Sequence, residues 1–125
     1  MASKPDTLDF DEIQILAQRT TNRDDPPLID VRDLNEVVNG IIPTAHHIPL
    51  SGLEAALALD DETFKAQYGF RKFGKDDEVV YYCRSGRRSN LAFQLTRGLG
   101  YTHVRNYPGS WIEYEAKGGV VGKFP

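Results

Sequence analysis

Short apolar runs and helical repeats alternate along the chain. Runs of aliphatic, β-branched and aromatic residues predict four strands, at residues 27–31, 45–48, 79–82 and 103–107. Between these runs, apolar residues recur every three or four positions, which is the spacing of a buried helix face. Strands that alternate with helices in this way are typical of an α/β domain around a largely parallel sheet.

Two of the helices have clear sequence signals. Asp9 and Glu12 have the spacing of a capping box, which places the start of the first helix directly after residue 9. Shortly after the third strand, Leu91, Leu95 and Leu99 repeat every four residues. Because positions four apart share one side of a helix, we expect these leucines to face the core, with Ala92 filling the same face.

Composition restricts the class of protein. The chain has 125 residues, of which 40% are hydrophobic and 26% charged, as in a single globular domain. We expect one domain over residues 1–125, ordered from about 8 to 117, with tails at 1–7 and 118–125. No apolar run approaches the roughly 18 residues of a membrane span, so no membrane contact is expected. The single cysteine excludes an intrachain disulfide and a Cys-rich zinc site, which favours a reduced, cytoplasmic setting and leaves mitochondrial residence open.

The net charge of −3 is distributed unevenly. From residue 79 to residue 112 there are five arginines and no Asp or Glu, so this block carries +5 and the rest of the chain −8. Cys83 lies inside the positive block. Because the chain is acidic overall and no helix has a basic stripe, the block favours a small anion as ligand and not a nucleic acid.

Cys83 stands between a predicted strand and a predicted helix, where open α/β sheets place their ligands. The first N–H groups of the helix and a glycine-containing turn favour an anion at this point. Full positive charges follow nearby, on Arg84, Arg87 and Arg88. We therefore expect Cys83 to be ionised at neutral pH and nucleophilic; the alternative is an inert, small core residue.

Several segments match one family in order. The stretch Y-Y-C-R-S-G-R-R-S at 81–89 resembles the active loop of the rhodaneses, which are thiosulfate sulfurtransferases. Four further segments resemble motifs of this family, at 28–32, 40–49, 99–101 and 106–111. The arrangement is most similar to single-domain eukaryotic thiosulfate sulfurtransferases. Ile41 and Thr44 depart from the family pattern, which often has His and Gly there; because Thr adopts positive φ only at a cost, we expect a different turn at residue 44.

The resemblance implies a five-stranded, largely parallel sheet flanked by helices on both faces, and a two-step reaction without metal or organic cofactor. Cys83 would take the outer sulfur of thiosulfate as a persulfide. An acceptor thiol, such as glutathione or a thioredoxin-like protein, or cyanide in an assay, would then remove it. The donor would be bound by the rest of the loop: Arg84, Ser85, Gly86, Arg87, Arg88 and Ser89. Asp30 and Arg32 would support the loop, and an arginine is the expected partner of Asp30.

Two other functions remain open. One is a phosphatase or arsenate reductase on the same fold, but cysteine phosphatases place an arginine six residues after the cysteine, where this chain has Ser89. The shorter loop fits a persulfide better than a phosphoryl group. The other is a non-catalytic binding module, whose usual mark, loss of the cysteine or of the loop charges, does not occur here. No metal site is expected at His46 and His47, because adjacent strand residues point to opposite faces.

Overall fold

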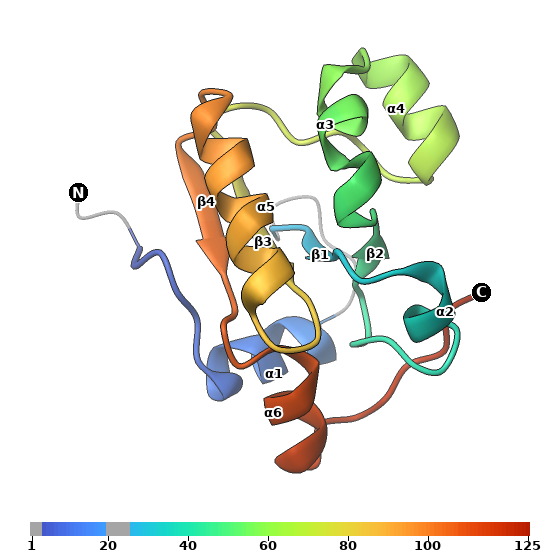
Figure 1. The fold of residues 1–125 in the computed structure, drawn as a ribbon, viewed down its shortest axis with the longest axis vertical. Coiled ribbons are helices and arrows are strands. Elements are labelled where there is room, and N and C mark those ends of the chain that lie inside the picture. Colours follow the sequence, from blue (N-terminus) through green and yellow to red (C-terminus); the bar gives the residue numbers. More distant parts are fainter. Residues whose placement is uncertain (1–3, 20–25) are drawn as a thin grey trace.

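A computed structural model describes residues 4–19 and 26–125. Strands and helices alternate as the apolar pattern predicts (Figure 1). In chain order, the elements are α1 (Phe10–Gln18), β1 (Leu28–Asp30), α2 (Leu34–Val37), β2 (His46–His47), α3 (Leu50–Ala58), α4 (Asp61–Tyr68), β3 (Glu78–Tyr82), α5 (Arg87–Gly98), β4 (His103–Asn106) and α6 (Ser110–Ala116).

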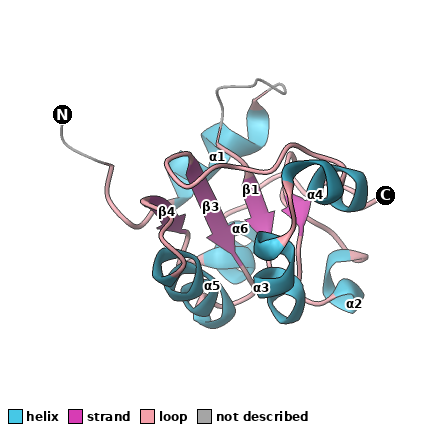
Figure 2. Cartoon of the chain, turned by 90° about the horizontal axis from the view of Figure 1, so that it is seen from above, coloured by secondary structure: helices cyan, strands magenta, loops and turns pink. Residues whose placement is uncertain are grey.

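The strands form one parallel sheet in the order β2-β1-β3-β4. Figure 2 shows β1 and β3 running side by side in the same direction. In this register, Asp30 at the end of β1 lies opposite Tyr82 at the end of β3 and His47 at the end of β2. The carboxyl ends of three strands therefore meet at one edge of the sheet, directly before Cys83.

Among the described residues, the sheet has four strands. The prediction of a five-stranded sheet is therefore wrong. Beside β4, the N-terminal segment forms a single parallel bridge, between Thr7 and Asn106. The chain cannot continue as a strand because Asp9 already caps α1, its side chain accepting a hydrogen bond from the Glu12 amide at 2.9 Å. The capping box that starts the helix thus ends the edge strand after one bridge.

Helices cover both faces of the sheet, as predicted, and each face has its own core. Val79 and Tyr81 of β3 face a core that α3, α4 and α5 complete. Val80 and Tyr82 point to the opposite face, where they pack against residues of α1 and α6. This alternation buries β3 on both sides, as expected for the central strand of a parallel sheet.

Only part of the face predicted for α5 is buried: Ala92 is, and Leu95 packs partly buried against the core. Leu91 and Leu99 are 49% and 39% exposed, and the other buried positions are Ser89 and Thr96. Small side chains let the helix approach β3 closely, and the Thr96 hydroxyl lies 2.9 Å from the hydroxyl of Tyr81. The same orientation turns Ser89 toward the end of β3, where Cys83 lies.

The expected change of turn at Thr44 is also wrong, because this threonine adopts a φ of +75°. A left-handed conformation costs a non-glycine residue about 1–2 kcal/mol. Part of that cost is offset by the Thr44 hydroxyl, which donates a hydrogen bond of 3.1 Å to the carbonyl of Leu16. The turn therefore keeps the geometry that glycine would give it.

The C-terminal segment folds back after α6. Gly122 and Ile41 exchange two backbone hydrogen bonds, of 3.2 and 2.7 Å, in an antiparallel bridge. The limits of the ordered part, expected at 8 and 117, stay a prediction. No helix in the described ranges is both long and apolar enough to cross a membrane.

Candidate active site

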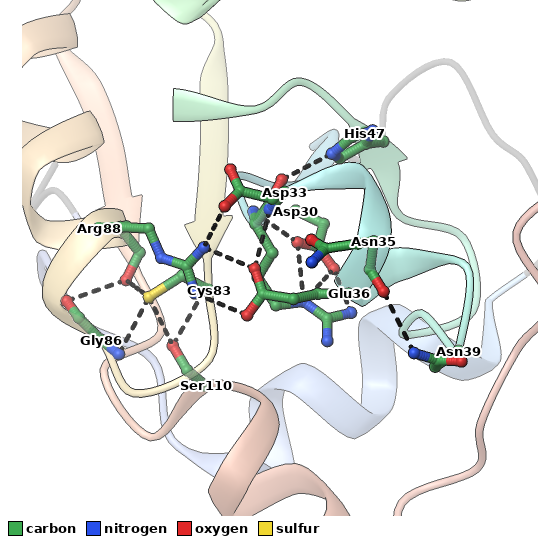
Figure 3. A network of polar contacts seen from close by, with 12 residues as sticks. Asp30, Asp33, Asn35, Glu36, Asn39, His47, Cys83, Gly86, Arg88 and Ser110 are labelled. Carbon is green, nitrogen blue, oxygen red and sulfur yellow. Dashed lines mark hydrogen bonds and ion pairs between the residues drawn. The ribbon is translucent and has the colours of Figure 1, made fainter. Parts of the chain in front are cut away.

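Cys83 follows β3 directly and begins the loop that leads into α5 (Figure 3). Its side chain is buried, with an exposed fraction of 1%. The loop is held from the other side by the start of α6, because the Trp111 amide donates to the carbonyl of Cys83 at 2.9 Å and the Ile112 amide to that of Arg84 at 3.0 Å. Two helices therefore fix the backbone around the sulfur.

Among the described residues, three groups lie within hydrogen-bond distance of the sulfur, and the Gly86 amide donates to it. The Gly86 amide lies 3.0 Å from Sγ, the Ser89 hydroxyl 3.4 Å and the Ser110 hydroxyl 3.9 Å. Burial alone would raise the pKa of the Cys83 thiol, but the hydrogen bonds from Ser89, Gly86 and Ser110 outweigh it and lower the pKa below its ordinary value. The site therefore favours a thiolate, which is the nucleophilic form of cysteine.

Gly86 is required at its position by the space around it. Its φ is +95°, and a Cβ atom there would lie 2.5 Å from the carbonyl oxygen of Pro108. Only glycine fits such a close approach of two backbones in a left-handed conformation. This tight packing directs the Gly86 amide at the sulfur.

The three arginines of the loop have different surroundings. Arg88 is bound by two acidic residues of the α2 region, Glu36 at 2.6 Å and Asp33 at 3.8 Å. Arg84 and Arg87 are exposed, and neither has an ion-pair partner in the part of the chain that the structure describes. The sequence attributes the thiolate to the helix N–H groups, the glycine-containing turn and these three arginines; of these, the Gly86 amide contacts the sulfur directly.

Asp30 and Arg32 form a buried ion pair behind the loop. Arg32 donates from Nη2 to Asp30 at 2.8 Å and from Nε to both carboxylate oxygens, at 3.0 and 3.1 Å. The same Nη2 reaches the carbonyl of Gly40 at 2.8 Å, and the guanidinium lies 4.5 Å from the ring centroid of Trp111. Burial opposes the charge of Arg32, but Asp30 raises the pKa of the guanidinium overall. The pair is thus satisfied within the protein and braces β1 against α6.

Sequence reasoning missed two residues of the site, Glu36 and Ser110. Ser110 is fully buried at a φ of +55°, and its hydroxyl accepts a hydrogen bond of 3.1 Å from the Cys83 amide and donates one of 2.9 Å to the Tyr107 carbonyl. Nothing in the sequence indicates that Ser110 is left-handed. Asp33 and Glu36 do have capping-box spacing, but this signal predicts a helix start and not a contact with the loop.

The two neighbouring histidines lie elsewhere and have separate partners. His46 stacks on Phe70 at a centroid distance of 3.7 Å, and Nε2 of His47 lies 2.7 Å from the carbonyl oxygen of Arg32. Both line a cavity of about 570 Å³ between the 41–47 segment, the end of α4 and the C-terminal residues. None of the residues 83–89 lines this cavity, so it belongs to a different part of the surface from the sulfur.

Comparisons with known proteins agree with this geometry. Residues 13–117 match the model of the rhodanese-like domain. A putative mitochondrial thiosulfate sulfurtransferase of Schizosaccharomyces pombe is 43% identical over 87% of this chain and 77% of its own, and a human thiosulfate:glutathione sulfurtransferase is 44% identical over 71% and 81%. Among solved structures, the human single-domain sulfurtransferase TSTD1 superposes with a TM-score of 0.81 at 37% identity, covering 91% of this chain and 98% of that one. The chain therefore belongs to the rhodanese family.

Proposed function

We propose that this protein is a thiosulfate sulfurtransferase that carries one sulfur atom on Cys83. The observation that carries the proposal is the buried Cys83 sulfur, which accepts a hydrogen bond from the Gly86 amide and lies beside the hydroxyl groups of Ser89 and Ser110. The Gly86 amide stabilises the thiolate that attacks, and the two hydroxyl groups can do so once they turn toward the ionised sulfur. Relatives named thiosulfate sulfurtransferase, similar over most of the chain, support the same reaction.

The reaction has two steps and needs no redox cofactor. In the first, the Cys83 thiolate attacks the outer sulfur of thiosulfate, the sulfur–sulfur bond of thiosulfate breaks, and sulfite leaves with the electron pair. In the second, an acceptor thiolate attacks the outer sulfur of the persulfide. The Cys83 thiolate then leaves, which returns the enzyme to its first state.

The donor is an anion, and the charged loop is suited to attract it. Arg84 and Arg87 are exposed beside the sulfur and free to turn toward a sulfonate group. Ser85 is exposed in the same loop, Gly86 closes the loop against Pro108, and Ser89 lies against the sulfur itself. Asp30 and Arg32 support the site from behind and do not bind the donor in this proposal.

The acceptor comes from outside the chain, because Cys83 is its single cysteine and no resolving thiol is available. Relatives in human and in Saccharomyces cerevisiae are named thiosulfate:glutathione sulfurtransferase, which supports glutathione as the acceptor. A thioredoxin-like protein is the alternative. A cytoplasmic location stays a prediction, since relatives in two yeasts are named mitochondrial.

Intact mass measurement tests the proposal directly. After incubation with thiosulfate, the wild-type protein should gain about 32 Da, the mass of one sulfur atom, and should lose it again on addition of glutathione. Cys83→Ser should gain nothing. A wild type without the gain, or a serine variant that gains it equally, would contradict the mechanism, and turnover of a phosphomonoester would favour the phosphatase alternative.

A further inference from the structure

Arg88, alone among the three loop arginines, is held by both of its terminal nitrogens. Its Nη1 and Nη2 donate to the two carboxylate oxygens of Glu36 at 2.6 and 2.9 Å. Glu36 belongs to α2 and lies 52 positions earlier in the chain. The pair therefore ties α2 to the first turn of α5 (Figure 3).

The carboxylate of Glu36 is itself fixed and ionised. Its Oε2 accepts a hydrogen bond of 2.9 Å from the Asp33 amide at the start of α2. The hydrogen bond from Arg88, opposed by partial burial and aided by the Asp33 amide, lowers the pKa of Glu36 to about 2. Since a two-pronged contact needs a fixed carboxylate, this geometry restrains the Arg88 side chain more than a single contact would.

The start of α5 also carries two of the three groups that lie against the sulfur, Gly86 and Ser89. Gly86 precedes Arg87 at the N-terminus of the helix, and Ser89 follows Arg88 directly. The Ser89 hydroxyl, which lies 3.4 Å from the sulfur, donates to the Gly86 carbonyl at 3.1 Å, so a hydrogen bond links these two residues. A tether on Arg88 is therefore a tether on the groups that hold the thiolate.

We infer that Glu36 is a positioning residue for the sulfur chemistry, acting through Arg88 to keep the Gly86 amide and the Ser89 hydroxyl on the Cys83 sulfur. The same contact occupies Arg88, so the anionic donor is bound by Arg84 and Arg87 and not by Arg88. This inference deepens the proposed function, because it divides the loop arginines into two that meet the donor and one that holds the loop.

Alkylation of Cys83 by iodoacetamide tests this role without any sulfur transfer. The rate is measured against pH for wild type, Glu36→Gln, Arg88→Lys, Arg88→Met and the double variant Glu36→Gln with Arg88→Met. We expect each variant to raise the pKa that governs alkylation of Cys83. The alkylation rate at pH 7 should fall about fivefold, which corresponds to the weakening of about one hydrogen bond to the sulfur. The double variant should match Arg88→Met alone. Glu62→Gln, an exposed change on α4, is the matched control.

Three outcomes of the alkylation experiment would overturn the inference. An unchanged profile in Glu36→Gln would show that the tether does not reach the sulfur. A lower pKa would show that Glu36 acts only as a nearby negative charge. Additive losses in the double variant would show that it does not act through Arg88. Arg88→Lys keeps the charge without the two-pronged contact, so it remains informative if Arg88→Met fails to fold.

Steady-state kinetics with thiosulfate supply the second readout. Glu36→Gln and Arg88→Lys should lower kcat about fivefold and leave the KM for thiosulfate within about twofold of wild type, whereas Arg84→Ala and Arg87→Ala should raise that KM. A KM raised as much by Arg88→Lys as by Arg84→Ala would mean that Arg88 binds the donor, contrary to the inference. Because alkylation needs no thiosulfate, a failed tether and a failed sulfurtransferase give different results.

Discussion

Ser110 offers the sharpest test of how the site holds its sulfur. Replacing it by alanine removes the hydroxyl that bonds the Cys83 amide at 3.1 Å and the Tyr107 carbonyl at 2.9 Å. Both partners are then left without this bond in a buried place, which costs about 1–3 kcal/mol. The left-handed backbone, at a φ of +55°, stays strained in the alanine variant.

Replacing Ser110 by glycine removes the same hydroxyl but relieves the strain. A left-handed conformation costs a non-glycine residue about 1–2 kcal/mol, and glycine avoids this cost. Glycine also has more freedom in the unfolded chain, which destabilises the folded state by about 0.5–1 kcal/mol and cancels part of the gain. We therefore expect Ser110→Gly to be more stable than Ser110→Ala by about 0.5–1 kcal/mol in urea unfolding. Both should raise the alkylation pKa of Cys83 equally, since both lose the same donor.

The pair of variants separates chemistry from stability. If Ser110→Ala is as stable as Ser110→Gly, the backbone at this position is not strained. If the two variants differ in alkylation profile, or neither differs from wild type, the hydroxyl is not a donor to the sulfur. If neither variant differs from wild type, the 3.9 Å contact between the Ser110 hydroxyl and Sγ does not affect the pKa of Cys83.

Three further predictions follow from the same contacts. Gly86→Ala places a Cβ 2.5 Å from the Pro108 carbonyl oxygen and should lower the unfolding free energy by about 2 kcal/mol or more, with loss of persulfide formation in the mass assay. Arg32→Ala should lower the free energy of unfolding, measured in urea, by about 3–5 kcal/mol, because it leaves the buried Asp30 carboxylate without its partner. Glu36 has its pKa lowered from 4.5 to about 2, so its contribution is complete above pH 4.5 and is lost as the pH falls toward 2; acid titration of Glu36→Gln should lack this part of the loss of stability.

Much of the fold could be predicted because its signals are local. The apolar runs mark each strand, and the strand–cysteine–turn–helix order places Cys83 at the carboxyl edge of the sheet before any coordinates are known. The Asp9 capping box is likewise confirmed at the start of α1. The repeat in α5 predicted Ala92 and Leu95 correctly but not Leu91 and Leu99, because periodicity shows which residues share a face and not where the centre of that face lies.

The site was less predictable because its contacts join distant parts of the chain. Glu36 reaches Arg88 across 52 positions, and Ser110 reaches Cys83 across 27. Neither residue has a sequence signal beyond its local role. Thr44 shows the same limit for the backbone: a residue that disfavours positive φ adopts it because Leu16, 28 positions away, accepts its hydrogen bond. Tertiary contacts of this kind override local preference.

Varying the ionic strength can show which groups stabilise the Cys83 thiolate. If exposed arginines held the negative charge of Cys83, raising the ionic strength would screen them, since the screening length falls from about 30 Å at 0.01 M to about 3 Å at 1 M. The donors on Sγ are in contact with it, at 3.0 to 3.9 Å, and its side chain is buried, so salt should leave the alkylation pKa unchanged. The KM for thiosulfate should rise over the same range, because Arg84 and Arg87 attract the donor from solvent. An alkylation pKa that rises together with KM would show that the arginine charges stabilise the thiolate, as the charge pattern of the sequence alone predicts.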